Sequence, residues 1–391
     1  MNARKVAPGL SAVGAVDWDR RLFDSLIPLP DGTSYNSYLL RTGKQTVLFD
    51  TVDPSQTATL MANLTSVDDL AYIVVHHVEQ DHSGSLLDVL ARFPQAQVLC
   101  SPKAVDLLGD HLHVDTSILR AVEDGEELSV GDKTLRFIHT PWVHWPETMS
   151  TYIVEDRVLL SCDMFGSHLA VSDVLARDEE VLPAAKRYYA EIMMPLHAAV
   201  SRNLTKIEHL DIALIGPSHG PVYTNPQLII EAYRDWAEGP PHNTVVIPHV
   251  TMHGSTRILV DRLTASLVDR GVRVERFDLA GVDLGRLATA LVDAATLVAG
   301  TPTVLTGPHP AMVSVLYLVN ALRPKTQFLS VVGSYGWGSK MLEMVKTYTA
   351  NMRAEFIEPV IVKGAPREED LERVDSLAGA IAQKHAEAGL T

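Results

Sequence analysis

Residues 244–388 alternate between strand-like and helix-like segments, and this alternation limits the fold more than any other feature of the sequence. Parallel neighbouring strands need a connection long enough for a helix, whereas antiparallel strands can be joined by a short turn. The alternation therefore predicts a parallel sheet with helices on both faces. The expected strands are 244–250, 272–277, 295–300, 326–332 and 355–363, and the expected helices are 255–270, 284–293, 311–321, 338–350 and 367–388.

The first part of the chain follows a different pattern, in which strands dominate and helices occur irregularly. We therefore predict a mixed-sheet sandwich with helices outside it. The breaker-rich segment 239–243 separates the two patterns, so we expect one domain at 1–242 and a second at 243–391. The expected strands of the first domain lie within 34–51 as a pair, and at 71–77, 96–101, 134–139, 151–155 and 157–162; the expected helices are 83–92, 102–110, about 180–203 and 226–238.

Length and charge limit the class of protein. With 391 residues the chain exceeds the length at which one hydrophobic core stops growing. Its net charge of −15, without any run of Lys and Arg, argues against a nucleic-acid partner, because a phosphate backbone requires a basic surface. Residues 1–14 lack the apolar core of a signal peptide, and no apolar run is long enough to cross a bilayer. We therefore expect a cytoplasmic protein with no membrane partner.

Only two cysteines occur, Cys100 and Cys162, and each lies next to an apolar strand-like run. Two thiols are too few for a disulfide framework or for a four-thiolate metal site. We expect both to be buried thiols.

Seven ligand-type side chains of the first domain each end or follow a strand-like run. Four of them lie within 77–82, which we expect to be an extended loop with alternate side chains on one side and His82 closing the turn. An isolated histidine is more often a structural residue, but seven such positions together predict a metal site. The predicted ligands are His77, Glu79, Asp81, His82, His144, Asp163 and His219.

Three loops of the second domain follow strands at the edge where an open parallel sheet binds its ligands. The first loop starts the helix at 255, and its hydroxyls and free backbone N–H groups, with Gly254 allowing close approach, suit a phosphate. Ser and Thr at a helix start are also ordinary capping residues, so the other two loops strengthen the interpretation. The three loops are 251–256, 300–305 and 333–338.

The metal residues resemble the metallo-β-lactamase superfamily, whose zinc hydrolases carry the loop His-x-His-x-Asp-His. Glu79 stands at the second His position, and His-x-Glu-x-Asp-His is the pattern of the flavodiiron proteins. A carboxylate in place of an imidazole favours iron over zinc. The resemblance extends to the segments HWPETM at 144–149, SCDMFG at 161–166 and PSHGP at 217–221. It implies a metallo-β-lactamase-like αββα sandwich followed by a flavodoxin-like doubly wound five-stranded parallel sheet, the minimal two-domain (A-type) form of the family.

The resemblance also implies a division of the ligands between two iron ions. His77, Glu79 and His144 would bind one iron, and Asp81, His82 and His219 the other, with Asp163 bridging them. His82 is the least uniform ligand in the family. His168 and Tyr189 are expected near the centre, His168 orienting a ligand.

The three loops of the second domain resemble the phosphate loop and the two isoalloxazine loops of flavodoxins, which implies FMN. His253 and the pair Val304-Leu305 depart from the family, where an aromatic residue and polar residues are usual, so flavin affinity or potential would differ. Tyr335 or Trp337 would border the flavin ring, unless it is a core residue. The expected FMN-binding residues are Thr251, Met252, His253, Gly254, Ser255, Thr256, Thr301, Pro302, Thr303, Val304, Leu305, Ser334, Tyr335, Gly336, Trp337 and Gly338.

Family membership would make the protein an oxidoreductase that reduces nitric oxide to nitrous oxide, dioxygen to water, or both, with electrons passing through FMN. Since the sequence has no Cys-x-x-Cys pair, an external donor such as rubredoxin or a reduced deazaflavin is implied. The family also implies a head-to-tail homodimer or a dimer of dimers. Two alternatives stay open: a zinc-dependent hydrolase with an attached flavodoxin domain, and a flavodoxin-type electron carrier with an inactive metal domain.

Overall fold

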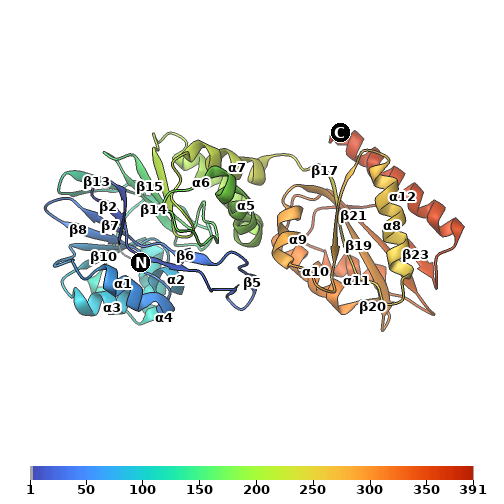
Figure 1. Cartoon of the computed structure of the whole chain (residues 1–391), viewed down its shortest axis with the longest axis horizontal. Coiled ribbons are helices and arrows are strands. Elements are labelled where there is room, and N and C mark those ends of the chain that lie inside the picture. Colours follow the sequence, from blue (N-terminus) through green and yellow to red (C-terminus); the bar gives the residue numbers. More distant parts are fainter. Residues whose placement is uncertain (1–2, 391) are drawn as a thin grey trace. The chain divides into compact units, whose positions relative to one another are not determined.

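The computed structural model describes residues 3–390. The chain divides into two compact units, and the boundary between them along the sequence lies between Ala237 and Glu238 (Figure 1). The expected boundary at 242/243 falls a few residues later, at the first residue of strand β17 (His242–His249). No helix within residues 3–390 has both the length and the apolar character needed to span a membrane.

The first unit contains two stacked sheets, as predicted, and both mix parallel with antiparallel pairs. The seven-stranded sheet has the order β1-β2-β7-β8-β9-β10-β11, and the five-stranded sheet runs from β12 to β16 in sequence order. The strands of the larger sheet are β1 (Arg4–Ala7), β2 (Leu10–Ala12), β7 (Tyr38–Arg41), β8 (Thr46–Phe49), β9 (Tyr72–Val75), β10 (Gln97–Cys100) and β11 (Leu119–Ala121). Those of the smaller sheet are β12 (Glu127–Val130), β13 (Lys133–His139), β14 (Met149–Ile153), β15 (Val158–Cys162) and β16 (Leu214–Pro217).

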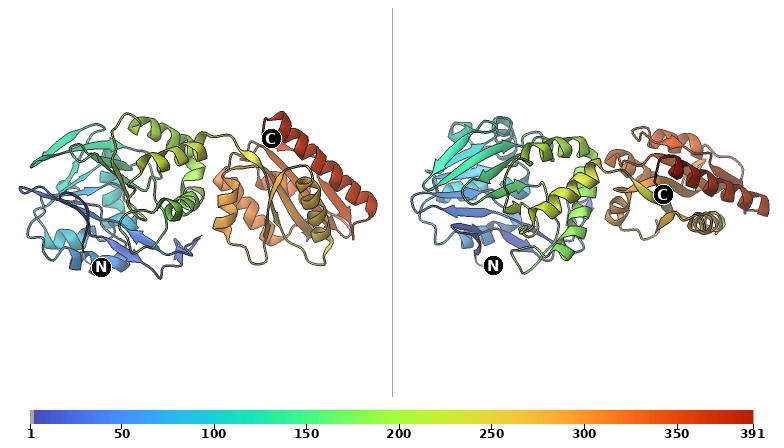
Figure 2. Two further views of the ribbon diagram at one scale, coloured as in Figure 1. Left: turned by 45° about the horizontal axis from the view of Figure 1, so that its top comes forward. Right: turned by 90° about the horizontal axis from the view of Figure 1, so that it is seen from above.

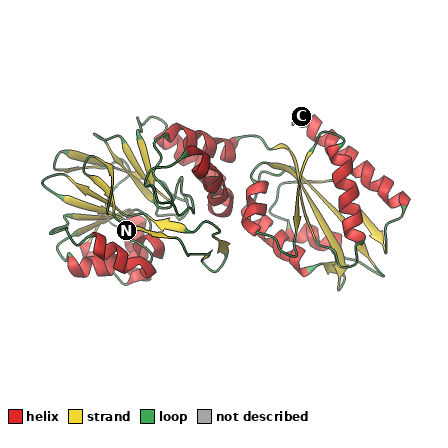
Figure 3. Ribbon diagram, in the orientation of Figure 1, coloured by secondary structure: helices red, strands yellow, loops and turns green. Residues whose placement is uncertain are grey.

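Strand β9 shows why its sequence is apolar at nearly every position. Val74 packs into the core between the two sheets, whereas Ile73 and Val75 pack into the core beneath the helices. A strand that is covered on both faces reads as a continuous hydrophobic run. Helices cover the outer faces of the sandwich (Figure 3), namely α1 (Thr57–Asn63), α2 (Gln80–Ser83), α3 (Leu86–Arg92), α4 (Pro102–Leu112), α5 (Asp178–Tyr188), α6 (His197–Ile207) and α7 (Pro226–Glu238).

Two parts of the first unit differ from the expectation. Seven strands lie where none was expected: β1, β2, β3 (Ala15–Asp17), β4 (Leu22–Phe23), β5 (Ile27–Pro28), β11 and β12, with β3 pairing with β6 (Thr33–Tyr35). These strands are short, and β2 pairs with the distant β7, so no local pattern marks them. The single helix expected at 180–203 is interrupted at 189–196, where Pro195 has no N–H to continue the ladder.

The second unit is the predicted parallel sheet, with order β18-β17-β19-β21-β22 and helices on both faces (Figure 2). One apolar core includes α8 and α12, and the other includes α9, α10 and α11. The strands are β17, β18 (Arg273–Asp278), β19 (Ala294–Val304), β20 (Gly307–Pro308), β21 (Phe328–Tyr335), β22 (Glu355–Phe356) and β23 (Val360–Lys363). The helices are α8 (Ser255–Val268), α9 (Leu284–Leu291), α10 (Pro310–Leu322), α11 (Met341–Tyr348) and α12 (Glu368–Glu387).

Two strands of this sheet run further than expected. β19 continues to Val304 and β21 to Tyr335, because they remain paired as far as Pro302 and Ser334 and because β19 turns back into β20. Residues 301–304, expected in a loop, therefore belong to a strand. The carboxyl ends of β17, β19 and β21 still meet at the point where strand order reverses.

A buried histidine anchors the last helix and predicts acid sensitivity. His385 Nδ1 lies 2.8 Å from Asn243 Oδ1, its Nε2 lies 2.6 Å from Thr296 Oγ1, and burial lowers its pKa to about 4. The unfolded chain, with an ordinary pKa, takes up a proton first as the pH falls below about 6.5. The second unit should therefore lose about 3 kcal/mol of stability between pH 6.5 and 4, and none from this group at higher pH.

Hydrogen exchange of the α12 amides, corrected for the intrinsic rate, tests this acid sensitivity. His385→Gln should reduce the pH dependence, and the exposed His242 provides the control as His242→Gln. An unchanged pH dependence in His385→Gln would contradict the assignment.

Candidate functional site

The segment after β9 changes direction at Glu79. Glu79 has φ −53° and ψ 143° and precedes α2, and its carbonyl accepts hydrogen bonds from the backbone N–H groups of His82 and Ser83, both at 3.0 Å. The expectation of an extended loop through Asp81 is therefore wrong, since a helical turn starts at Gln80. The turn separates the two pairs of side chains, so that His77 and Glu79 join one group and Asp81 and His82 another.

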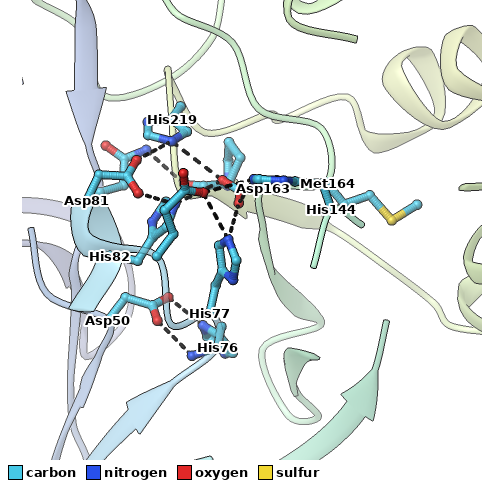
Figure 4. Close-up of polar contacts among 12 residues, drawn as sticks. Asp50, His76, His77, Asp81, His82, His144, Asp163, Met164 and His219 are labelled. Carbon is cyan, nitrogen blue, oxygen red and sulfur yellow. Dashed lines mark hydrogen bonds and ion pairs between the residues drawn. The ribbon is translucent and has the colours of Figure 1, made fainter. Parts of the chain in front are cut away.

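Three more elements bring the remaining side chains to this loop. His144 lies between β13 and β14, Asp163 directly follows β15, and His219 lies two residues after β16. Figure 4 shows these side chains converging with His77, Asp81 and His82. In the first group, Glu79 Oε2 lies 3.1 Å from His77 Nε2 and 3.0 Å from His144 Nε2. In the second, the Asp81 carboxylate lies 3.2 Å from His82 Nε2 and 3.1 Å from His219 Nε2. All seven predicted ligands thus lie in one cluster.

Asp163 lies between the two groups. Its Oδ2 is 3.6 Å from His77 Nε2 and 3.5 Å from His144 Nε2. Its Oδ1 is 3.1 Å from His82 Nε2 and 3.5 Å from His219 Nε2. Each oxygen of this one carboxylate therefore faces a different group of side chains.

Several donor atoms of the cluster form no hydrogen bonds with one another and are arranged as ligands of a cation would be. Both oxygens of Asp81, both oxygens of Asp163 and His82 Nε2 are buried without a partner in hydrogen-bond geometry among the residues described. Buried polar atoms are normally paired, so atoms that converge without pairing point to a bound cation. Carboxylate and imidazole donors without thiolate suit iron and similar transition metals.

The charges within the cluster are consistent with a bound cation. Burial alone would lower the pKa of His77, but hydrogen bonds with Glu147 and Glu79 outweigh it and raise the pKa to about 9. Burial alone would raise the pKa of Asp163, but the neighbouring His82 holds it well below its usual range. Asp163 thus stays anionic inside the protein, and a metal would replace the proton on His77.

Groups outside the cluster orient two of its imidazoles. Glu147 Oε1 lies 2.7 Å from His77 Nδ1 and accepts a hydrogen bond from Val78 N at 3.1 Å. His219 Nδ1 lies 2.7 Å from the carbonyl oxygen of Ser34. Both contacts direct Nε2 toward the cluster. Glu147 stands in the motif at 144–149 but received no role from the sequence, and the Ser34 contact, made by a backbone atom, leaves no sequence signal.

Loss of the Glu147 carboxylate should weaken metal binding without abolishing it. In Glu147→Gln, His77 Nδ1 loses its anionic partner, and a loss of about 10- to 100-fold in iron affinity is expected. Competition with a chelator measures the affinity, and the exposed Glu127→Gln is the control. Equal affinity in wild type and Glu147→Gln would contradict the orienting role.

The two residues expected beside the centre lie in different surroundings. The His168 ring lies 4.9 Å from the His219 ring. Tyr189 lies away from the centre, against Tyr233 and Trp236, with ring centroids 5.4 and 5.5 Å away. Its neighbour Tyr188, which the sequence did not indicate, faces His168 and His219, with ring centroids 4.9 and 5.8 Å away. Adjacent residues of a helix point in different directions, so a one-residue offset changes the surroundings completely.

The second unit has a cavity of about 640 Å³ at the carboxyl ends of β17, β19 and β21. This volume is within the roughly 300–1,000 Å³ of small-molecule sites. Of the predicted residues, thirteen line it: Thr251, Met252, His253, Ser255, Thr256, Pro302, Thr303, Leu305, Ser334, Tyr335, Gly336, Trp337 and Gly338. Thr306, Gly364 and Ala365 line it as well and were not predicted.

Three predicted residues do not line the cavity. Gly254 has φ +92° and precedes α8, which explains the glycine, and Thr301 Oγ1 accepts a hydrogen bond from His309 N at 3.0 Å. Val304 belongs to the end of β19. The expectation that these three residues line the ligand site is therefore corrected.

The cavity fits a phosphate-bearing planar ligand. Thr256 Oγ1, in the first turn of α8, is buried without a hydrogen-bond partner among the described residues. A hydroxyl at a helix N-terminus suits a phosphate. Leu305 and Trp337 are 96% and 94% exposed, so neither is a core residue. Apolar side chains beside a cavity suit the faces of an aromatic ring system.

Comparisons with known proteins found relatives and solved structures that match both units. The model of the ODP family beta lactamase matches residues 33–220. A nitric oxide reductase from Moorella thermoacetica is 35% identical over 397 residues, which covers 98% of each chain. The structure of rubredoxin oxygen:oxidoreductase from Desulfovibrio gigas has a TM-score of 0.94 and 28% identity, covering 98% of both chains.

A flavodiiron protein from Giardia intestinalis has the same fold, with a TM-score of 0.90 and 24% identity over 98% of both chains. The likeness therefore extends over the metal cluster, the cavity of the second unit and their order along the chain. This chain belongs to the flavodiiron protein family.

Proposed function

We propose that this protein is an oxidoreductase that reduces nitric oxide to nitrous oxide, dioxygen to water, or both, at a diiron centre supplied with electrons through FMN. The observation that carries the proposal is the Asp163 carboxylate, whose two oxygens face two separate sets of ligands. In this proposal residues 1–242 form the diiron domain and 243–391 the FMN domain.

One iron would be held by His77, Glu79 and His144, the other by Asp81, His82 and His219, with Asp163 shared. His82 belongs to the second set because its Nε2 lies near both Asp81 and Asp163. When bound, the two irons and FMN supply the electrons for the reduction. The carboxylates among these residues would balance the positive charge of the two ions. Glu147 keeps the His77 imidazole in the required orientation, and the carbonyl of Ser34 does so for His219.

In the second unit, the loop at 251–256 would hold the FMN phosphate, and Leu305, Tyr335 and Trp337 would border the ring. Thr256 Oγ1 and the backbone at the start of α8 provide hydrogen-bond donors without a cationic side chain. Leu305 offers no hydrogen bond where the family commonly has polar residues, so the flavin potential is expected to differ from that of relatives. The cavity opens to solvent beside this residue and Trp337, which would let an external donor, rubredoxin or a reduced deazaflavin, reach the flavin.

A head-to-tail homodimer, or a dimer of such dimers, would cover the exposed apolar residues of both units. In the first unit Trp18, Leu22, Leu26 and Trp142 are 47%, 47%, 66% and 48% exposed, and Trp142 is two residues from His144. In the second, the exposed Met252, Leu305 and Trp337 line the cavity. Such patches are unusual on a monomer and typical of an interface. Analytical ultracentrifugation of Trp142→Glu should show a shift toward monomer, and an unchanged mass would contradict this interface.

The reaction is tested by loading the protein with ferrous iron and FMN in the absence of oxygen, supplying reduced rubredoxin, and following each gas separately with an electrode. Consumption of nitric oxide with formation of nitrous oxide, or of dioxygen with formation of water, is expected. Failure to consume either gas with both cofactors bound would overturn the proposal. Two zinc ions per chain with hydrolase activity would instead support the zinc-dependent alternative.

The cytoplasmic location stays a prediction.

A further inference from the structure

Aromatic side chains form a wall beside the Asp81, His82 and His219 half of the cluster, and this wall contains a buried imidazole nitrogen without a partner. His168 is part of this wall, and its ring centroid lies 5.3 Å from Phe23, 4.9 Å from Tyr188 and 4.9 Å from His219. The His168 side chain is buried, and its Nε2 has no hydrogen-bond partner within residues 3–390. Such an atom in a native protein calls for an explanation.

His168 is fixed from the opposite edge of its ring. Its Nδ1 lies 2.9 Å from Thr33 Oγ1 on β6, and the backbone of the adjacent Ser167 donates to the carbonyl of His219 at 3.0 Å. Because Nδ1 and Nε2 lie on different edges of the imidazole, the Thr33 contact turns Nε2 away from β6. Thr33 Oγ1 also lies 3.3 Å from the carbonyl oxygen of Ser34, but its contact with Nδ1 is the shorter one. When the Thr33 hydroxyl donates to Nδ1, the ring proton is on Nε2, which is then a hydrogen-bond donor.

This geometry differs from that of a residue that orients a metal ligand. His77 is oriented by Glu147, and His219 by the carbonyl oxygen of Ser34. The hydrogen bond of His168 goes instead to Thr33, outside the cluster. An orienting role through a hydrogen bond to the cluster therefore does not explain why a polar side chain stands in this wall.

On the basis of the proposed function, we infer that His168 is a positioning residue whose Nε2 forms a hydrogen bond with the small molecule bound beside the Asp81, His82 and His219 half. Sites for small molecules are mostly apolar, with a few polar groups that set the orientation of the ligand. Phe23 and Tyr188 supply aromatic surface here, and His168 Nε2 supplies a polar atom that has no partner among the described residues. Its partner would be an oxygen or nitrogen lone pair of a diatomic gas or of a small linear anion.

Three substitutions of His168 distinguish the contribution of its Nδ1 from that of its Nε2. The amide of Asn occupies nearly the position of Nδ1 and can keep the Thr33 contact, whereas the longer Gln places its amide near the position of Nε2. His168→Leu removes both groups. The probe is azide, added to the oxidised, iron-loaded full-length protein and titrated through its absorption band, together with iron and FMN content and the KM and kcat for each gas.

All three variants should retain two irons and FMN. His168→Leu and His168→Asn should bind azide about five- to tenfold more weakly than wild type, the loss expected for one hydrogen bond, and should raise KM more than they lower kcat. His168→Gln should bind azide within about twofold of wild type, because it replaces the lost hydrogen bond.

The remaining outcomes overturn the inference in different ways. Loss of iron in His168→Leu and His168→Gln alike would show a ligand or ligand-orienting role. A normal His168→Asn with a weakened His168→Gln would show that only the Thr33 contact matters. Equal azide affinity in every variant would also refute the inference. If the wild-type protein itself holds no iron pair, the proposed function fails before this inference is tested.

Discussion

The Asp163→Ala variant should lose the metal centre while keeping the flavin. The Asp163 carboxylate is shared between the two ligand groups, with one oxygen facing each, so its removal takes one donor from each proposed metal and leaves four imidazoles without their common anion. We expect a fall of more than about 100-fold in iron affinity, beyond the loss typical of a residue that only orients a ligand. Iron per chain after gel filtration, with FMN measured by its absorbance, checks this.

Asp211→Ala is the matched control, because Asp211 is an exposed carboxylate of the same unit that pairs with Arg157. It should hold iron like the wild type. If Asp163→Ala retains both irons, the bridging role is wrong. If it loses FMN as well, the substitution has disturbed the whole protein and the two units are not independent in binding their cofactors.

The second large effect is expected from Gly333→Ala, which should lose FMN and keep iron. A Cβ atom at Gly333 would lie 2.1 Å from the carbonyl oxygen of Thr301, which is its partner in the register of β19 and β21. The backbone would have to move where the two ring loops begin, at a cost of about 1–3 kcal/mol. We expect FMN affinity to fall at least tenfold, to be measured by fluorescence titration.

Gly281→Ala gives the comparison, because nothing lies within 4 Å of a Cβ atom at that position and it is outside the cavity. It should bind FMN like the wild type. Unchanged FMN affinity in Gly333→Ala would mean that the two loops adjust without displacing the ligand. Lost iron in Gly333→Ala would mean that the effect is general unfolding.

The predicted metal ligands could be located in the sequence because they are concentrated in short motifs. Four of the seven occupy residues 77–82, and the other three follow strands whose apolar runs are easily recognised. The structure brings all seven together. Their separation into two groups was not derivable from alternation along an extended loop, because the helical turn at Gln80 depends on hydrogen bonds to Glu79 that form only in the folded chain.

The cavity of the second unit was less completely predicted. The three loops at strand ends were recognised, but Gly364 and Ala365 come from a fourth loop with no motif of its own. Thr301 and Val304 were expected at the ligand and belong instead to a strand that extends into a hairpin. The length of a strand depends on the strands that pair with it. β19 and β21 stay paired beyond the ends that their own segments of sequence indicate.

The sequence by itself determined the two patterns of secondary structure, the chemical identity of the metal ligands and the parallel order of the second unit. These follow from periodicity, from residue type and from the length of the connections, which are local properties of the chain. Tertiary structure decided which of these side chains lie together in each group, that Tyr188 rather than Tyr189 faces the cluster, and that Glu147, Ser34 and Thr33 contact its histidines and His168. Such contacts join residues up to 185 positions apart, and distances across the fold are set by packing of the two sheets and not by any pattern along the chain.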